Sequence, residues 1–211
     1  MGRLEQRPLA ELVHGELLAE VMNGTCAAGS KLSEEGICRK FGVSRTPARE
    51  ALMMLCRDGI VDRIPRRGCF VKAFDPEELA ELFECRRLVE CLALDLGFDQ
   101  IPKPAVAALE KRLAGKAGGD RKKSLEVDDE LHALIVKSCP NRCLREIAGQ
   151  LLRRTFPYRL WRTNETRSVS GISEERRRIL SAIRRADKAA ALRLLGEHIE
   201  QGRRMVEKLG R

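Results

Sequence analysis

The sequence lacks the long apolar run that a membrane-spanning helix needs. None of its segments approaches roughly 18 uninterrupted apolar residues, and residues 1–12 (MGRLEQRPLAEL) contain no apolar signal-peptide core. Both absences argue against a membrane protein and against a secreted one. We therefore expect a cytoplasmic protein with no membrane partner.

The sequence has eight cysteines but lacks the CxxC spacing of zinc ribbons and redox pairs. The cysteines lie among apolar residues, as small hydrophobic side chains would, so we expect free thiols and no disulfides. The CPNRC stretch at residues 139–143 is wider than a thioredoxin-like CxxC. It favours a turn that connects two helices, with a redox pair as the alternative.

The second half of the sequence also lacks the alternation that is typical of half-buried strands. Leu, Ala, Glu and Arg recur there at the 3.6-residue period of helices, which predicts a helical bundle. The stretch FDPEE at residues 74–78 indicates a short linker into a helix, with Asp75 as its cap and Pro76 at its first position. Since 211 residues can form two cores, we predict two domains, residues 1–74 and residues 75–211.

The most informative segment that is present is FGVSRTPAREAL at residues 41–52. Ser44 can cap a helix there, and Arg45 and Arg49, four residues apart, share its outward face near the N-terminus. An arginine fork matches O6 and N7 of guanine, whereas Thr46 can bond a phosphate. This helix is therefore predicted to read bases in a DNA major groove.

A second helix precedes the reading helix. It is predicted at about residues 33–41 and ends at Gly42, which permits the tight turn between the two helices. This spacing is that of a helix-turn-helix. The net charge of the chain is +9, and residues 39–72 contain nine lysines and arginines against three acidic residues. That local excess supports contact with phosphates.

A small β-wing is predicted after the reading helix. Residues 60–64 and 69–71 have the character of two short strands around the turn PRRG. The tip carries Arg67 beside Gly68, a residue that allows close backbone approach, and this suits a minor groove or its phosphates. The alternative is a small helical domain with a solvated basic face.

Residues 17–71 resemble the winged-helix domain of the GntR family of bacterial regulators. The resemblance is carried by GTCAAGSKLSEE, FGVSRTPAREAL, LCRDGIV and RRGCFV. At the position where some members have a DNA-contacting arginine in the second helix, this chain has Glu35. The resemblance places the DNA-contacting residues at Ser44, Arg45, Thr46, Arg49, Arg67 and Gly68.

Five polar residues of the second half fall on the apolar faces of predicted helices. Asp128 and His132, four residues apart, would share one face and could ligate one metal. The alternative is an ordinary core contact, such as a histidine bonded to a carbonyl, an Asp–His pair or an arginine that reaches solvent. The five residues are Arg86, Asp128, His132, Arg176 and His198.

Residues 77–204 resemble the FCD effector domain that is attached to many GntR regulators. The resemblance is carried by FECRRLVE, DDELH, PNRCL and ISEERRRILSAIRRADKAAALRLLGEHI. It implies that Arg86 binds an effector carboxylate and that one aspartate and three histidines hold a divalent metal such as zinc, nickel or manganese. The matching metal ligands are Asp128, His132 and His198.

The fourth metal position falls on Arg176. A guanidinium stays protonated and has no lone pair for a metal, whereas it can clamp an anion bidentately. We therefore expect no cofactor, a largely metal-free pocket, and a small carboxylate bound by Arg86 and Arg176. Asp128, His132 and His198 would complete that effector site.

These features predict a mainly α-helical protein, with a winged helix-turn-helix followed by an all-helical effector domain. We expect a transcription regulator, a repressor rather than an enzyme, that binds a pseudo-palindromic double-stranded operator as a homodimer. The resemblance places dimerisation in the helical domain. The competing hypotheses are a metal-assisted hydrolase built on Asp128, His132 and His198, and a DNA-binding module without an effector. Against the hydrolase, the sequence shows no evident general acid or base beyond those ligands.

Overall fold

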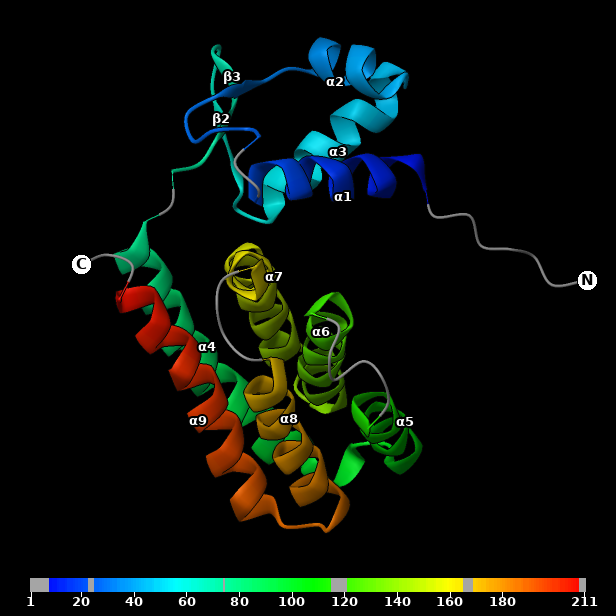
Figure 1. Cartoon of the computed structure of the whole chain (residues 1–211), viewed down its shortest axis with the longest axis vertical. Coiled ribbons are helices and arrows are strands. Elements are labelled where there is room, and N and C mark those ends of the chain that lie inside the picture. Colours follow the sequence, from blue (N-terminus) through cyan, green and yellow to red (C-terminus); the bar gives the residue numbers. More distant parts are fainter. Residues whose placement is uncertain (1–7, 23–24, 74, 115–120, 165–168, 209–211) are drawn as a thin grey trace, which may run out of the picture. The chain divides into compact units, whose positions relative to one another are not determined.

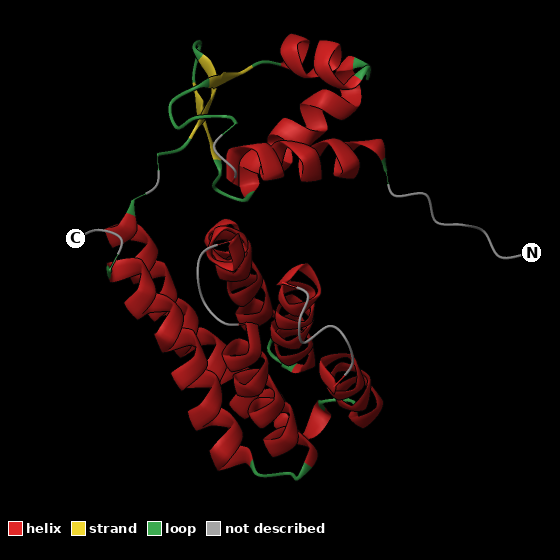
Figure 2. Ribbon diagram, in the orientation of Figure 1, coloured by secondary structure: helices red, strands yellow, loops and turns green. Residues whose placement is uncertain are grey.

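The computed structural model describes residues 8–22, 25–73, 75–114, 121–164 and 169–208. The chain divides into two compact units, one up to residue 74 and one from residue 75, and each is helical in its larger part (Figures 1 and 2). The described strands all lie in the first unit. The predicted fold class is confirmed. Among the described residues, no helix is both long and apolar enough to cross a membrane.

The first unit combines helices with a small antiparallel sheet, whose strand order is β1-β3-β2. Helix α1 lies against α3, and α2 packs on α3 as well. The elements of this unit are α1 (Leu9–Met22), β1 (Lys31–Leu32), α2 (Glu34–Phe41), α3 (Arg45–Arg57), β2 (Val61–Ile64) and β3 (Gly68–Val71).

The helix-turn-helix forms where the sequence predicts it. Ser33 caps α2 by accepting a hydrogen bond of 3.0 Å from the Gly36 amide. Gly42 ends α2 in the left-handed conformation, with φ of 64°, which a residue without Cβ adopts at little cost. The chain then enters α3, whose inward face includes the fully buried Ala51 and Leu55. The turn therefore fixes α2 and α3 relative to each other.

The wing is the hairpin of β2 and β3, in which Ile64 pairs with Gly68. Arg66 (φ 62°) and Gly68 (φ 113°) both have positive φ at its tip. A Cβ at Gly68 would lie 3.0 Å from Cε of the flexible Lys31 side chain, so the positive φ is the stronger reason for glycine here. Strand β1 was not predicted, because two residues are too few to show an alternating pattern.

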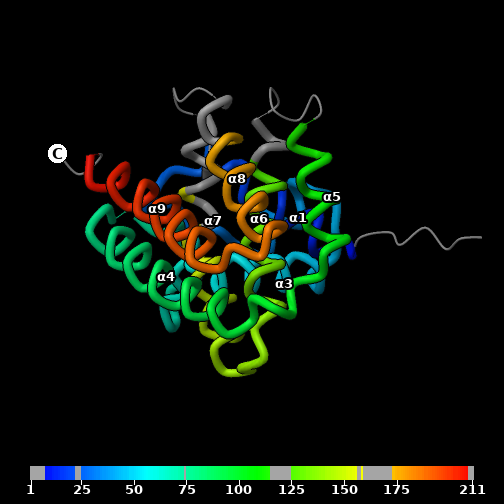
Figure 3. The backbone as a smooth tube through the Cα atoms, turned by 90° about the horizontal axis from the view of Figure 1, so that it is seen from below, coloured from blue at the N-terminus to red at the C-terminus, as the bar shows by residue number. Residues whose placement is uncertain are grey.

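The second unit is a helical bundle. Figures 1 and 3 show α4 and α9 side by side, and α4 also packs against α6 and α7. Helix α5 packs against α6 and α8. The described elements are α4 (Pro76–Gly97), the short 3-10 helix η1 (Phe98–Gln100), α5 (Lys103–Ala114), α6 (Arg121–Ser138), α7 (Arg142–Asn164), α8 (Val169–Arg184) and α9 (Lys188–Glu207).

Helix α4 begins as the sequence predicts. The Asp75 carboxylate accepts hydrogen bonds from the amides of Glu77 (3.0 Å) and Glu78 (3.3 Å), and Pro76 occupies the first turn. The two glutamates also lie near the positive end of the helix dipole. The start of this long helix is thus fixed locally, within a few residues of the first unit.

Two glycines allow helices of the second unit to approach one another closely. A Cβ at Gly97, the last residue of α4, would lie 2.5 Å from the carbonyl oxygen of Ser138. A Cβ at Gly202 in α9 would lie 2.5 Å from the ring of Phe83. Phe83 is itself buried and meets Tyr158 edge to face, with ring centroids 5.5 Å apart. The close contacts of α4 therefore depend on glycine at both places.

We predict that Gly97→Ala destabilises the protein by about 1–3 kcal/mol, because the added methyl group meets backbone atoms that cannot rotate away. Gly196→Ala is the matched control, since its Cβ would lie 3.7 Å from the Cys91 sulfur, an ordinary contact. Alanine there should be neutral or stabilise α9 by up to about 1 kcal/mol. Urea unfolding measures both variants, and equal stability of the two would contradict the packing.

Candidate functional sites

The first unit exposes the N-terminal turn of α3. Ser44 occupies the predicted cap position with extended backbone (φ −72°, ψ 171°), but its hydroxyl accepts no capping hydrogen bond from the described residues of the helix. The prediction that its side chain caps α3 is therefore wrong. The exposed hydroxyl stays available to other partners, beside the exposed side chains of Arg45 and Thr46.

The other predicted DNA-contacting residues are also exposed or half-buried. Arg49 lies 3.8 Å from the Glu34 carboxylate, and both side chains are exposed, so this ion pair holds the arginine weakly. Arg67 lies at the wing tip, 5.9 Å from the centre of the Phe70 ring, and Gly68 beside it is half-buried. The structure thus brings the predicted residues together in two groups, one at the start of α3 and one at the wing tip.

The second unit buries all five polar residues that the sequence singled out. Their exposed fractions lie between 0 % and 6 %. This excludes the alternative that either arginine reaches solvent. Four helices supply the five side chains, α4, α6, α8 and α9, and the residues are Arg86, Asp128, His132, Arg176 and His198.

Asp128 is the point at which three of these side chains meet. Arg176 Nε donates to Asp128 Oδ1 at 2.7 Å, and His198 Nε2 lies 3.1 Å from the same oxygen. His132 Nε2 is 3.8 Å from it. Burial tends to raise the pKa of Asp128, but the charge of Arg176 and the hydrogen bond from His198 hold it well below its usual range. Asp128 therefore stays ionised.

Glu90 is a member of this cluster that sequence reasoning missed. It is completely buried on α4, one turn after Arg86, whose Nε donates to Glu90 Oε1. The other carboxylate oxygen lies 2.5 Å from His132 Nδ1. Burial tends to raise the pKa of Glu90, but Arg86 and His132 lower it to about 2. The spacing of four residues between Arg86 and Glu90 was a signal that could have identified the pair.

Both histidines are held between two carboxylates. His132 Nδ1 faces Glu90, and His198 Nδ1 lies 3.1 Å from Glu175 Oε2, while both Nε2 atoms point toward Asp128. The rings are stacked, with centroids 5.4 Å apart. Burial lowers the pKa of His132 although Glu90 opposes it, so His132 is neutral near pH 7. Its contact with Glu90 then places the proton on Nδ1 and a lone pair on Nε2.

Two buried nitrogen atoms of this cluster, Arg86 Nη2 and His132 Nε2, lack hydrogen-bond partners among the described residues. An unmade hydrogen bond at a buried polar atom costs about 1–3 kcal/mol, so such atoms are rare in folded proteins. One of them is a donor and the other, in the tautomer above, is an acceptor. An acceptor would satisfy the first and a donor the second.

The cluster fits a divalent metal poorly. One oxygen or nitrogen atom each of Asp128, His132 and His198 lies within 4.8 Å of the others, and a carboxylate on Nδ1 is typical of metal-bound histidine. Arg176, however, already bonds the aspartate oxygen that such an ion would share. Charges of +2 and +1 about 4 Å apart repel by about 8 kcal/mol at an effective dielectric near 20. The guanidinium therefore opposes an ion at this place.

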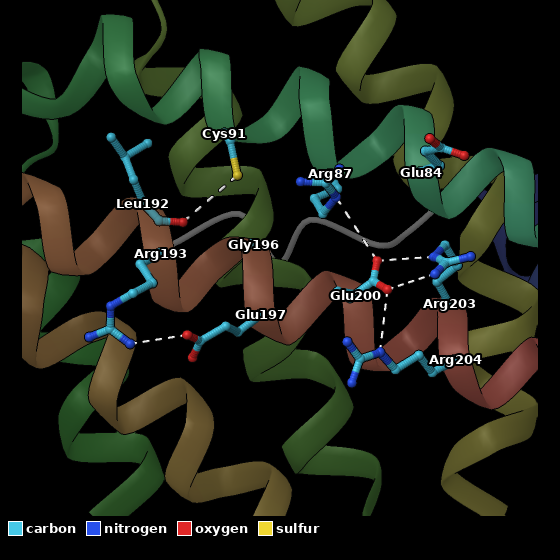
Figure 4. Close-up of a pocket in the computed structure, with 10 residues that line it drawn as sticks. All are labelled: Glu84, Arg87, Cys91, Leu192, Arg193, Gly196, Glu197, Glu200, Arg203 and Arg204. Atoms are coloured by element: carbon cyan, nitrogen blue, oxygen red, sulfur yellow. Dashed lines mark hydrogen bonds and ion pairs between the residues drawn. The ribbon is translucent and has the colours of Figure 1, made fainter.

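A separate groove of about 580 Å³ lies on the surface between α4 and α9 (Figure 4). Glu200 there accepts hydrogen bonds from Arg203 (2.7 Å) and Arg204 (3.4 Å) and lies 4.0 Å from Arg87. Arg193 pairs with Glu197 at 3.1 Å. The groove therefore carries cations and anions side by side, and its lining residues are distinct from those of the buried cluster.

Comparison with known proteins assigns both units to families. Residues 9–71 match the model of bacterial regulatory proteins of the gntR family, and residues 81–201 match the FCD domain. An uncharacterized HTH-type transcriptional regulator of Bacillus subtilis, YdhC, is 26% identical over 183 residues, which cover 84% of this chain and 82% of that protein. The HTH-type transcriptional repressor RspR of Escherichia coli is 22% identical over 92% of this chain and 87% of its own length.

The fold is shared with a solved structure as well. E. coli McbR/YncC superimposes with a TM-score of 0.75 at 21% identity, over 98% of this chain and 100% of that one. The FCD match alone spans more than half of the sequence, and the gntR match covers the winged helix. The resemblances on which the sequence-based interpretation relied are thereby confirmed, and the chain belongs to the GntR family of bacterial transcription regulators, in its FCD subfamily.

Proposed function

We propose that this regulator is a homodimeric repressor whose binding to a pseudo-palindromic operator depends on a small carboxylate bound inside the helical unit. The proposal of a bound carboxylate rests on one observation. Arg86 Nη2 is a buried guanidinium nitrogen that has no hydrogen-bond partner among the described residues. A buried donor of this kind is best satisfied by an anionic acceptor. The named relatives, among them a repressor, support the direction of regulation.

Arg86 is the primary contact of the proposed effector. Its Nε is bound to Glu90, which leaves the Nη2 edge for one carboxylate oxygen. A donor group on the effector could bond His132 Nε2, the ring nitrogen turned away from Glu90. Arg176 adds positive charge beside Asp128 rather than a free fork, because its Nε already donates to that carboxylate. Asp128 and His198 complete the polar wall of the site.

The DNA contacts in this proposal come from exposed side chains of the first unit. Arg45 and Arg49 would read base edges, whereas Ser44, Thr46, Arg67 and Gly68 would contact the backbone or the minor groove. One reading helix covers too few base pairs for specific recognition in a genome, so two copies must act together. A two-fold dimer then imposes a matching symmetry on its operator.

The exposed face of α4 supports a dimer in the helical unit. Leu88, Leu92 and Leu96 follow one another at intervals of four residues and are 58%, 47% and 45% exposed. Such a stripe on one helix face is typical of a surface that another helix covers. The neighbouring groove carries charges of both signs, which can pair with those of a second copy across a two-fold axis (Figure 4). A second copy of this chain is therefore the proposed occupant.

The hydrolase hypothesis finds little support in the buried cluster. A general acid or base works best with a pKa near the working pH. Burial raises the pKa of Glu90 and of Asp128, but their cationic neighbours outweigh it and hold both values low. Arg176 also bonds the Asp128 oxygen that a water-activating metal would need as a ligand. We therefore propose a binding site and no enzymatic activity.

The first prediction of this proposal concerns base reading. Arg45→Ala or Arg49→Ala should cost about 1–3 kcal/mol of binding free energy on the operator and relax base preference. Lys72→Ala, outside α3, should weaken operator and random DNA by similar factors. Fluorescence anisotropy measures the affinity of each variant for both duplexes. Sedimentation gives the number of chains bound to each operator duplex. Equal losses on both duplexes for all three variants, or one chain per operator, would contradict the proposal.

The second prediction concerns Arg86. A thermal-shift panel of small mono- and dicarboxylates should identify ligands that stabilise the protein, and calorimetry then gives their affinity. Arg86→Lys keeps the charge beside Glu90 but removes Nη2, so affinity should fall at least about tenfold. Arg193→Lys, in the exposed groove, is the matched control and should bind normally. Unchanged affinity in a folded Arg86→Lys protein, or no carboxylate binding by the wild type, would rule out this site.

A further inference from the structure

Glu90 contacts Arg86 and His132, the two residues whose buried nitrogens lack hydrogen-bond partners within the described part of the cluster. One carboxylate oxygen of Glu90 accepts a hydrogen bond from Arg86 Nε, and the other lies 2.5 Å from His132 Nδ1. The Glu90 side chain is completely buried, so water does not screen either contact. Glu90 therefore acts on the charge of Arg86 and on the hydrogen bonding of His132 together.

Each buried arginine of the cluster is neutralised by a carboxylate. Arg86 pairs with Glu90 and Arg176 with Asp128, and all four side chains are at most 3% exposed. Burial alone would raise the pKa of both carboxyl groups, but their arginines hold it low, so both stay ionised. The two pairs therefore contribute no net positive charge.

The two histidines of the cluster add no surplus positive charge either. Burial lowers the pKa of His132 although Glu90 opposes it, so this ring is neutral near pH 7. His198 lies 3.1 Å from a carboxylate oxygen of Asp128 and 3.1 Å from one of Glu175, so a positive charge on this ring would face two anions. The cluster thus presents Arg86 Nη2 as a donor without an excess of positive charge around it.

We propose that Glu90 restricts the effector to molecules with a single carboxylate and makes dicarboxylates of the same size bind more weakly. One carboxylate can accept a charge-assisted hydrogen bond from Arg86 Nη2. A second would bring another negative charge into a buried site whose own charges already cancel, and a buried charge without a partner is costly. This inference rests on the proposed function, because it concerns the molecule that Arg86 would bind.

His132 also opposes a second carboxylate. Since Glu90 is ionised and can only accept, His132 Nδ1 is the donor in their contact. The lone pair of the neutral ring is then on Nε2, which has no hydrogen-bond partner among the described residues. A lone pair repels a carboxylate oxygen, whereas a hydroxyl or an amide N–H can donate to it. A second polar group of the effector that reached Nε2 would therefore have to be a neutral donor.

The test compares dicarboxylates with their half-amides, in which a carboxamide of the same size replaces one carboxylate. Succinate with succinamate and glutarate with glutaramate are examples, and the panel contains both members of every pair. Thermal shift of the full-length protein at neutral pH identifies the compounds that bind, and calorimetry gives their affinities. We expect each half-amide to bind at least about tenfold more tightly than its dicarboxylate.

Glu90→Gln tests the role of Glu90 itself. The amide oxygen can still accept from Arg86 Nε, whereas the amide N–H would donate to His132 Nδ1 and place the ring proton on Nε2. The net charge of the cluster rises by one and Nε2 becomes a donor. The preference for the half-amide over the dicarboxylate should therefore fall at least about tenfold.

Glu146→Gln is the matched control for this variant. Arg142 Nε and Glu146 Oε1 form an ion pair of 3.2 Å with the same spacing of four residues, but both side chains are exposed. Loss of this charge should leave the preference unchanged. NMR of the histidine ring nitrogens adds a measurement that needs no ligand, with the His132 proton expected on Nδ1 in the wild type and on Nε2 in Glu90→Gln.

A dicarboxylate that binds the wild type as tightly as its half-amide would overturn the proposal, whether or not Glu90→Gln folds. An unchanged preference in a folded Glu90→Gln protein, or a wild-type His132 with its proton on Nε2, would overturn the role of Glu90. If neither member of any pair binds, the carboxylate site of the proposed function fails instead, and the NMR measurement still decides whether Glu90 sets the position of the ring proton.

Discussion

The buried ion pair between Arg176 and Asp128 is the interaction on which the helical unit depends. Its 2.7 Å hydrogen bond joins two side chains that are each almost completely buried. Removal of one partner of such a pair typically costs about 3–5 kcal/mol, because the other charge is left uncompensated. The pair keeps Asp128 ionised, which in turn orients His198. It also places a permanent cation where related domains are expected to hold a metal.

The second ion pair of the cluster, between Arg86 and Glu90, differs in one respect. It leaves a guanidinium nitrogen without a hydrogen-bond partner among the described residues, whereas it satisfies His132 Nδ1. In the proposed function, the first pair opposes a metal and the second leaves a donor for an anion. Arg86 and Glu90 lie on α4, the helix that begins directly after the winged-helix unit. A ligand bound to Arg86 would therefore contact α4, the helix that follows the wing in the sequence.

The sequence predicted the features that depend on local contacts. The Gly42 turn, the start of α4 at Asp75 and Pro76, and the inward direction of Arg86 all follow from capping rules or helical spacing. It missed what depends on contacts across the fold. The contact between Glu90 and His132 could not be predicted, because it forms only where α6 packs against α4. Strand β1 could not be predicted either, because it forms only by pairing with β3. For Ser44 the sequence predicted the right cap position of α3, but it also predicted a capping hydrogen bond to the Ser44 hydroxyl that the structure does not show.

The central claim is that Arg176 replaces the metal in a site built to bind an anion. The most direct measurement is elemental analysis of wild-type and Arg176→His protein after equilibration with zinc, nickel and manganese and removal of the excess. The account predicts no stoichiometric divalent metal in the wild type. It predicts about one ion per chain in Arg176→His, where a fourth nitrogen ligand joins Asp128, His132 and His198. One tightly bound divalent ion per wild-type chain would contradict it.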